Sequence, residues 1–338
     1  MKIQLRFLPM TVIVISLSAL FLPACRGKSK SVSSEPYVRS EGMVWNTEFH
    51  VTYQGPLSLR DSVIEVFGRI GKSLSVFDTA SLVSRVNRQD STPVNDDFIR
   101  VYVMARKISK LSDGAFDPTI SPLITAWSFG PGHKATADTA RIDSIRQFVG
   151  IRRTRLSHDA LIKEDIRTEF NFSALAKGYG CDEVGAMFRR NGVENFLIEV
   201  GGEIYASGHS ERGSQWNISV DAPVFSDSVI VHESQCVISF TDMGVATSGN
   251  YRNFRREGSR TFGHIISTSS GRPAETDILS ATVLAPTAME ADALATAFMA
   301  MGSARSIELN KRLRLPVMIV MADSVWKSRE FERLESHD

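Results

Sequence analysis

Apolar and polar positions follow helical spacing in several long segments of the chain. Apolar residues recur every three or four positions in residues 63–74 and 98–111, and the second of these helices ends at Asp113-Gly114. Further helices are predicted over residues 141–148, 173–190, 287–301 and 304–313. The third of these opens on Thr287-Ala288-Met289-Glu290, which has the form of a capping box.

Strand-like alternation fills much of the sequence between these helices. Residues 45–53 (WNTEFHVTY) alternate clearly, and residues 161–172 indicate two short strands on either side of Asp165. Further strands are predicted over residues 195–200, 216–220, 229–233, 237–240, 278–284 and 317–321. Because helices and strands are mixed irregularly and no repeat is present, we expect an α+β fold in one compact domain over residues 42–338.

The first 24 residues have the pattern of a lipoprotein signal peptide. Lys2 and Arg6 supply a basic start, residues 11–22 are apolar, and Leu22-Pro23-Ala24-Cys25 resembles a bacterial lipobox. The apolar run is too short for a membrane-spanning helix. We therefore expect Cys25 to become the lipidated first residue, whose acyl chains anchor the protein to a membrane. A plain secretory peptide and an uncleaved anchor are the alternatives.

The segment after the lipobox is rich in serine and charge. Residues 26–40 (RGKSKSVSSEPYVRS) contain almost no apolar side chains, so they cannot contribute to a core. Residues 25–41 are therefore expected to be the lipidated cysteine and a flexible tether. This arrangement places the domain outside the cytoplasm of a bacterial cell, on the periplasmic side of the inner membrane.

Composition narrows the choice of function only slightly. The chain has 338 residues, of which 43% are hydrophobic, and 39 Lys and Arg against 38 Asp and Glu give a net charge of +1. This balance provides no basic excess that would favour nucleic acid. Three cysteines exclude a disulfide framework. After Cys25, Cys181 and Cys236 could pair in an oxidising compartment or stay as buried thiols.

Five segments contain more glycine, polar and charged residues than packing requires. They are 113–119 (DGAFDPT), 171–180 (NFSALAKGYG), 200–203 (VGGE), 246–251 (ATSGNY) together with 262–266 (FGHII), and 290–296 (EADALAT). Each also has an ordinary structural explanation. The first and third can be simple turns, and the lysine, histidine and acid in the others can be surface or packing residues.

The chemistry of these segments nevertheless points to phosphate and a metal. Lys177 lies one turn inside a helix whose first N–H groups lack partners, an arrangement that suits a phosphate. Asp292 and Thr296 are four residues apart and share one helix face, where a carboxylate and a hydroxyl form a partial Mg²⁺ site. Thr247 and Ser248 offer hydroxyls beside an expected glycine turn. His264 lies between a glycine and an apolar run, where its pKa could suit proton transfer.

The order of these motifs resembles the ApbE family, the FAD:protein FMN transferases, also described as flavin-trafficking lipoproteins and formerly as thiamine biosynthesis lipoproteins. The resemblance covers residues 42–322. The motifs that carry it are Ser75-Val76-Phe77-Asp78, Ser84-Arg85-Val86-Asn87, Asp113-Gly114-Ala115-Phe116-Asp117-Pro118, Ala174-Leu175-Ala176-Lys177-Gly178-Tyr179, Gly201-Gly202, Ala246-Thr247-Ser248-Gly249-Asn250-Tyr251 with His264-Ile265-Ile266, and Asp292-Ala293-Leu294-Ala295-Thr296. The resemblance implies a single ApbE-like domain of mixed sheets and helices.

The resemblance also implies the roles of individual residues. FAD would be contacted by Trp45, Phe77, Ala115, Phe116, Asp117, Asn171, Lys177 and His264. Mg²⁺ would be held by the side chains of Asp292 and Thr296 and by the backbone of Ala174 and Ala295. His264, or Asp117 acting through it, would accept the proton of the attacking hydroxyl.

Three positions depart from the family pattern. Asn171 stands where the family usually has Asp, Trp45 where it often has Met, and Phe77 where it often has Tyr. Asn keeps an acceptor oxygen without the charge, and Phe can stack but cannot donate a hydrogen bond. None of these changes affects the expected metal pair.

The implied reaction is Mg²⁺-dependent transfer of FMN from FAD to a Ser or Thr hydroxyl of an acceptor flavoprotein, with release of AMP. The expected acceptor is a subunit of a membrane redox complex or another extracytoplasmic flavoprotein, and no nucleic acid is involved. Two alternatives stay open at this point. One is a Mg²⁺-dependent FAD pyrophosphatase that gives FMN and AMP, and the other is a non-catalytic flavin-binding lipoprotein.

Overall fold

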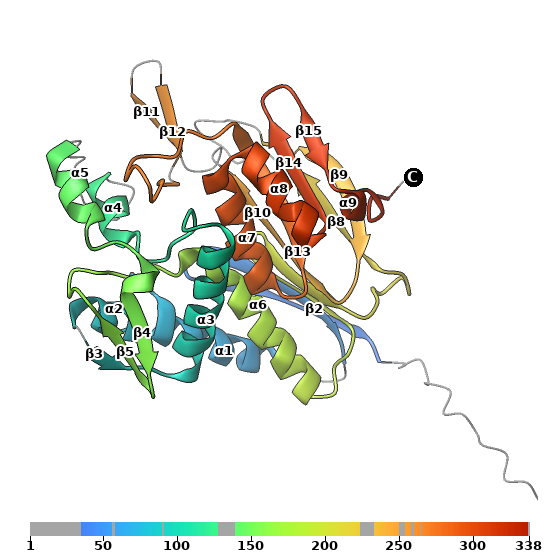
Figure 1. Ribbon diagram of the computed structural model, residues 1–338. Coiled ribbons are helices and arrows are strands. Elements are labelled where there is room, and N and C mark those ends of the chain that lie inside the picture. The colour runs from blue at the N-terminus through green and yellow to red at the C-terminus, as the bar shows by residue number, and fades with distance from the viewer. Residues whose placement is uncertain are drawn as a thin grey trace, which may run out of the picture. The chain divides into compact units, whose positions relative to one another are not determined.

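An eight-stranded antiparallel sheet forms the framework of the domain (Figure 1). The computed structural model describes residues 35–55, 58–89, 91–127, 139–223, 233–249, 254–257, 260–263 and 265–336. In order across the sheet, the strands are β1 (Tyr37–Val44), β2 (Thr47–Gln54), β6 (Phe196–Val200), β7 (Glu203–Ser207), β10 (Met243–Gly249), β13 (Ile278–Ala285), β14 (Val317–Met321) and β15 (Val325–Lys327).

Four helices pack with one another and with this sheet around the main core. They are α1 (Arg60–Leu74), α3 (Asp96–Leu111), α6 (Ser173–Arg190) and α7 (Ala288–Met301). In α1, buried Val63, Phe67 and Ile70 recur at helical spacing and form its inner face. Helix α7 is apolar along almost its whole length and is buried between α6 and strands β10 and β13. Asp292 is therefore carried into the interior, whereas Glu290 and Thr296 are half-buried.

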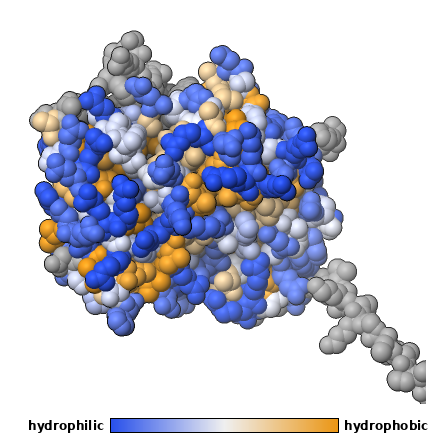
Figure 2. All heavy atoms as spheres, in the orientation of Figure 1, coloured by the Kyte–Doolittle hydropathy of each residue, from blue (hydrophilic) through white to orange (hydrophobic). Residues whose placement is uncertain are grey.

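A second hydrophobic cluster packs the β8–β9 hairpin against the same sheet. Strands β8 (Trp216–Asp221) and β9 (Ser234–Phe240) contribute Trp216, Ile238 and Phe240, which pack with Ile204 of β7 and with Phe331. The last of these belongs to α9 (Arg329–Glu332), and α8 (Ser303–Leu313) packs against α7. On the face shown in Figure 2, hydrophobic residues reach the surface as patches between hydrophilic ones.

Smaller elements surround the helical side of the domain. They are α2 (Leu82–Arg88), a sheet of β3 (Ser91–Pro93), β5 (Ala160–Lys163) and β4 (Thr154–Ser157), the 3-10 helix η1 (Ile151–Arg153), helices α4 (Ser121–Ala126) and α5 (Thr139–Arg146), and the hairpin of β11 (Phe254–Glu257) and β12 (Arg260–Gly263). A small third cluster joins Leu123, Ala126 and Ile142 to Ile266.

The α+β prediction is confirmed, and several local predictions need correction. The tether was expected to reach residue 41, but Tyr37–Val44 form β1, an edge strand whose exposed, polar residues hide its alternation. Trp45 and Asn46 belong to the turn between β1 and β2, and both have positive φ (48° and 62°). The two strands predicted within 161–172 were placed too late in the sequence. The structure has β4 and β5 earlier, and residues 164–172 contain only an isolated bridge.

The segment 246–249 was expected to form a glycine turn, but it is the second half of β10. Ser173 was expected to cap α6, but it lies in the first turn, and the side chain of Asn171 accepts a hydrogen bond from its N–H group (2.9 Å). Thr287 caps α7 as predicted, because the Glu290 N–H group donates to its hydroxyl (3.2 Å), while the Glu290 carboxylate pairs with Lys107. Cys181 and Cys236 are both free thiols. In the part of the chain that the structure describes, no helix has the length and apolar character needed to span a membrane.

Candidate functional site

Helices α6 and α7 approach each other without a side chain between them. A Cβ added to Gly178 of α6 would lie 2.5 Å from the carbonyl carbon of Ala288 and 2.7 Å from the backbone nitrogen of Met289. A Cβ added to Gly244 of β10 would lie 2.5 Å from the carbonyl carbon of Thr287. Glycine is therefore required on both sides of the first residues of α7. This close approach brings the polar residues of the two helices into one space.

A charged cluster occupies that space. Lys177 of α6 forms an ion pair with Glu203, the first residue of β7. The Lys177 side chain is 32% exposed, so a ligand can reach it, whereas the Glu203 side chain is only 5% exposed. Asp292 of α7 is buried, and the Gly178 N–H group donates to it at 3.4 Å. The Lys177 ammonium group thus lies near two buried carboxyl groups, those of Glu203 and Asp292, at the contact between α6 and α7.

The pKa values in this cluster follow from burial and charge. Burial and repulsion by Glu203 together raise the pKa of Asp292 to about 8, although the charge of Lys177 opposes both effects. For Lys177, burial disfavours the charged form, but the charges of Glu203 and Asp292 outweigh it and raise the pKa. Lys177 is therefore a cation at neutral pH. Additional positive charge beside Asp292 would favour its ionised form.

Oxygen atoms suitable for a hard cation lie on the same side of α7. Thr296 follows Asp292 by one helical turn, and its hydroxyl is 3.0 Å from the hydroxyl of Ser248 on β10. Ala174, in the first turn of α6, departs from helical geometry (φ −88°, ψ 17°), so its carbonyl group is not held in the regular helical pattern. Ala295 is fully buried between the two α7 residues.

These donors fit Mg²⁺ better than a soft metal ion. Among the described residues, no group of three or more His, Cys, Asp or Glu side chains could hold a metal ion. Mg²⁺ does not need such a group, because it is commonly bound by one or two carboxylates together with substrate phosphates and water. One buried carboxylate, Asp292, with hydroxyl and carbonyl oxygens nearby meets that requirement.

The loop 113–119 is joined to the neighbouring segments by hydrogen bonds. The Asn171 N–H group donates to the carbonyl oxygen of Pro118 (2.7 Å), and the Thr268 hydroxyl donates to that of Gly114 (2.6 Å). The Phe116 side chain is buried in the main core, so only its backbone is available to a ligand. Ala115, which precedes it, is partly exposed. The loop 113–119 is thus a neighbour in space of Asn171 and of Thr268.

Asp117 organises this loop. Its carboxylate accepts hydrogen bonds from the Thr119 N–H group (2.9 Å), the Thr119 hydroxyl (2.6 Å) and the Ile151 N–H group (2.9 and 3.1 Å to the two oxygens). Burial raises its pKa, although these hydrogen bonds oppose the shift. These contacts are those of a structural acceptor. Its part in proton transfer stays a prediction.

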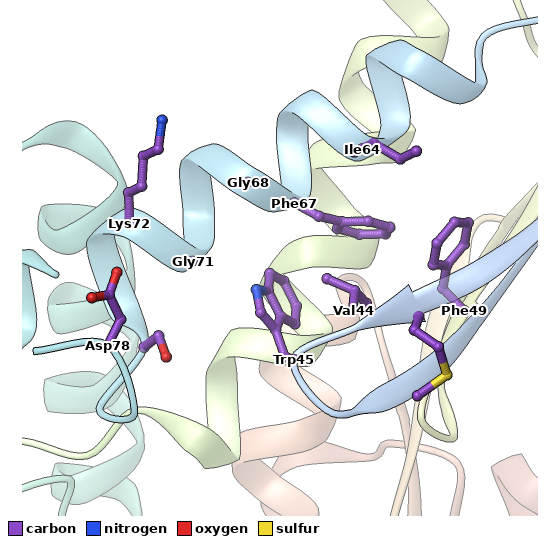
Figure 3. Close-up of a pocket in the computed structure, with 11 residues that line it drawn as sticks. Val44, Trp45, Phe49, Ile64, Phe67, Gly68, Gly71, Lys72 and Asp78 are labelled. Atoms are coloured by element: carbon purple, nitrogen blue, oxygen red, sulfur yellow. The ribbon is translucent and has the colours of Figure 1, made fainter. Parts of the chain in front are cut away.

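Trp45 lines a cavity of about 370 Å³ between the β1–β2 hairpin and α1 (Figure 3). Its indole packs edge-on against Phe67, with ring centroids 5.4 Å apart, and lies against Gly71 of α1 and Gly180 of α6. Gly180 follows Lys177 by three residues, so the Trp45 indole contacts α6 one helical turn from Lys177. Phe77, in the loop after α1, is 64% exposed and available for stacking.

Two predicted residues, His264 and Cys25, lie outside the described residues. The segment after His264 is described: Ile265 and Ile266 are buried, and Thr268 contacts the loop 113–119 as given above. Thr268, four residues after His264, is therefore beside the predicted FAD loop.

Comparison with known proteins agrees with this arrangement of motifs. The family model described as "ApbE family" matches residues 45–319. The chain belongs to the ApbE family. The FAD:protein FMN transferase of Vibrio cholerae is 30% identical over 324 residues, which cover 92% of this chain and 93% of that protein. The FAD:protein FMN transferase of Haemophilus influenzae is 29% identical over 320 residues, or 90% of each chain.

Solved ApbE structures share the fold. The flavin transferase ApbE from Vibrio cholerae superposes with a TM-score of 0.79 at 28% identity, covering 89% of this chain and 99% of that one. The apo form of Pseudomonas stutzeri flavinyl transferase ApbE gives a TM-score of 0.79 at 27% identity, covering 89% and 98%. The similarity thus extends over nearly the whole of these two structures.

Sequence reasoning missed two acidic residues of this ApbE chain. Glu203 was seen only as the end of a glycine motif, although an acid directly after Gly201-Gly202 was the available signal. Asp182 of α6 was not noticed, yet its carboxylate accepts hydrogen bonds from the Ala288 and Met289 N–H groups (2.8 and 2.9 Å) at the start of α7. It therefore caps the helix that contains the predicted metal ligands.

Proposed function

We propose that this protein is an enzyme that transfers FMN from FAD to an acceptor flavoprotein. The observation that carries the proposal is the charged cluster of Lys177, Glu203 and Asp292 at the α6–α7 contact, in a chain of the ApbE family. Its curated relatives are named FAD:protein FMN transferase. A cation that a ligand can reach, beside a buried carboxylate, suits the diphosphate of FAD together with a divalent metal ion.

Mg²⁺ is the metal ion that we propose for this site. Asp292 and Thr296 would hold it through their side chains, with backbone oxygens from Ala174 and Ala295. When bound, Mg²⁺ would neutralise charge on the diphosphate. Lys177 would contact the same phosphates, and Glu203 would hold its ammonium group in place. Phosphoryl transfer depends mainly on such positioning and electrostatic stabilisation.

The acceptor oxygen would form a new bond to the phosphorus on the FMN side of FAD. The bond from that phosphorus to the bridging oxygen breaks, and AMP leaves with this oxygen. The product is a phosphoester between FMN and the Ser or Thr residue. We propose that His264 takes the hydroxyl proton; the hydrogen bond from Thr268, four residues further along the chain, to the loop 113–119 supports this.

We further propose that the enzyme is lipid-anchored through Cys25, outside the cytoplasm. The lipobox-like sequence and the serine-rich segment that follows support this location. The acceptor would be a subunit of a membrane redox complex. A test is growth with a labelled fatty acid: wild-type protein should become labelled and Cys25→Ala should not. Label in the Cys25→Ala variant would refute the anchor.

A transfer assay tests the activity directly. Residues 26–338 would be incubated with FAD and Mg²⁺, with and without a Ser/Thr acceptor domain, and analysed by chromatography and intact mass. We expect the acceptor to gain one FMN group while AMP appears in equal amount, and EDTA to stop both. Free FMN and AMP without labelled acceptor would instead indicate the pyrophosphatase. Unchanged bound FAD with a competent acceptor would indicate a flavin-binding protein.

A further inference from the structure

Asn87, near the end of α2, holds the backbone of Phe170 through two hydrogen bonds. Its side-chain nitrogen donates to the Phe170 carbonyl oxygen (2.9 Å), and the Phe170 N–H group donates to its side-chain oxygen (2.7 Å). Phe170 is fully buried in the main core. A buried backbone group needs a partner, and here one side chain satisfies both groups of the same residue.

Lys163 also forms hydrogen bonds that fix the same stretch of chain. Its buried ammonium group donates to the carbonyl oxygens of Ile166 and Thr168, both at 2.9 Å, and to that of Asn87 at 3.4 Å. Residues 164–172 contain only an isolated bridge, so strand pairing does not fix their path. Side-chain hydrogen bonds from Asn87 and Lys163 fix the path of these residues instead.

This stretch leads directly into the proposed site. Asn171 follows Phe170, donates through its N–H group to Pro118, and accepts from the Ser173 N–H group at the start of α6. Ala174 and Lys177 lie in the next turn. The position of Phe170 therefore sets where the first turn of α6 begins.

We propose that Asn87 is a positioning residue for the FAD and Mg²⁺ contacts of this enzyme. It acts through the backbone of Phe170 and does not itself contact FAD or the metal ion. The inference rests on the proposed function, and it explains the motif Ser84-Arg85-Val86-Asn87, which has no other role in the site. A residue that only stabilises the fold would lower stability without a specific effect on ligand binding.

Asn310 provides a matched control for that distinction. Its side-chain nitrogen donates to the Leu315 carbonyl oxygen (3.0 Å), and the Leu315 N–H group donates to its side-chain oxygen (3.2 Å). Asn310 is buried, at 3% exposure, whereas Asn87 is half-buried. It thus makes the same pair of hydrogen bonds to one backbone residue, but neither α8 nor the loop after it contains a predicted site residue.

The test compares Asn87→Ala with Asn310→Ala in residues 26–338. The readouts are Tm, the Kd for FAD from flavin fluorescence, the Mg²⁺ concentration that gives half-maximal transfer, and kcat. We expect both variants to lower Tm. Asn87→Ala should also raise the FAD Kd or the Mg²⁺ requirement at least tenfold, while Asn310→Ala stays within twofold of the wild type. Equal FAD and Mg²⁺ parameters in the two variants would overturn the proposal.

A second pair covers the case in which Asn87→Ala does not fold. Asn87→Asp keeps the size and the acceptor oxygen but replaces the donor with an oxygen, and Asn310→Asp makes the same change at the control position. The FAD Kd and the Mg²⁺ requirement of these two variants are then compared in the same way to test the proposal. Wild-type protein that binds FAD but transfers nothing would refute the proposed function alone, because the FAD Kd values still test Asn87. Wild-type protein that does not bind FAD would refute both.

Discussion

Gly178→Ala should separate helices α6 and α7 and thereby impair both stability and activity. The added Cβ would lie 2.5 Å from the carbonyl carbon of Ala288, about 1 Å short of the ~3.5 Å at which carbon atoms are in contact. The obstructing atoms are backbone, so no side chain can rotate away. Overpacking of this kind costs about 1–3 kcal/mol, against a gain of about 0.5–1 kcal/mol from replacing a helical glycine. We expect a net loss of about 1–2 kcal/mol.

The control for stability is Gly68→Ala in α1. A Cβ at Gly68 would have no other atom within 4 Å, so only the helix gain of about 0.5–1 kcal/mol remains. Urea unfolding should therefore give opposite signs for the two variants. Transfer by Gly178→Ala should fall about 100-fold, because a displacement of about 1 Å between Lys177 and Asp292 disturbs the alignment of reacting groups. A Gly178→Ala protein as stable and as active as the wild type would refute this reasoning.

Three further predictions concern the metal, the base and pH. Asp292→Asn should abolish Mg²⁺ stimulation of transfer yet nearly keep the Tm in EDTA, because a buried carboxyl group with a pKa of about 8 is already largely neutral without the metal ion; normal Mg²⁺ stimulation would contradict the assignment. His264→Ala should leave the FAD Kd nearly unchanged and lower kcat at least 100-fold, and full activity would exclude His264 as the base. For Asp182, burial raises the pKa in the folded state from 3.8 to about 7. Between these pH values the folded state binds more protons than the unfolded state, so wild-type stability should fall as the pH rises from 3.8 to about 7. Between pH 5 and pH 8, urea unfolding should show a fall in stability that is about 3 kcal/mol smaller in Asp182→Asn than in the wild type, since about two pKa units of about 1.4 kcal/mol each lie between pH 5 and the folded pKa, and equal pH dependence in both proteins would exclude Asp182 as a source.

The pattern of apolar and polar residues predicted the helices and strands that bury one face or are buried on all sides. Helix α6 was expected over 173–190, and β14 over 317–321, and the structure has both with these limits. The edge strand β1 was missed because its residues are intermediate or exposed, so no apolar face repeats along it. β10 was missed because small residues in Ala246-Thr247-Ser248-Gly249 resemble a turn, and only its pairing with β13 reveals a strand.

The sequence predicted which segments contribute to the site, but not how their side chains are placed relative to one another. Lys177 and Asp292 were each expected to take part, from the chemistry of their own helices. Their proximity depends on Gly178 and Gly244, whose role appears only when α7 is placed against both. Glu203 could not be assigned to Lys177 from spacing either, because the pair joins residues 26 positions apart on a helix and a strand.

The position of Asp292 links the fold to the function. Helix α7 is almost entirely apolar and is buried by α6, β10 and β13, so a carboxylate there is removed from water. Burying such a charge is costly unless a cation accompanies it, and an apolar residue of similar size would often be more stable. Lys177 supplies one cation, but it is shared with Glu203, so without a further cation Asp292 stays largely protonated near neutral pH, as its raised pKa indicates. A bound divalent cation would supply the missing positive charge, which is why this helix favours a metal-dependent enzyme over a purely structural protein.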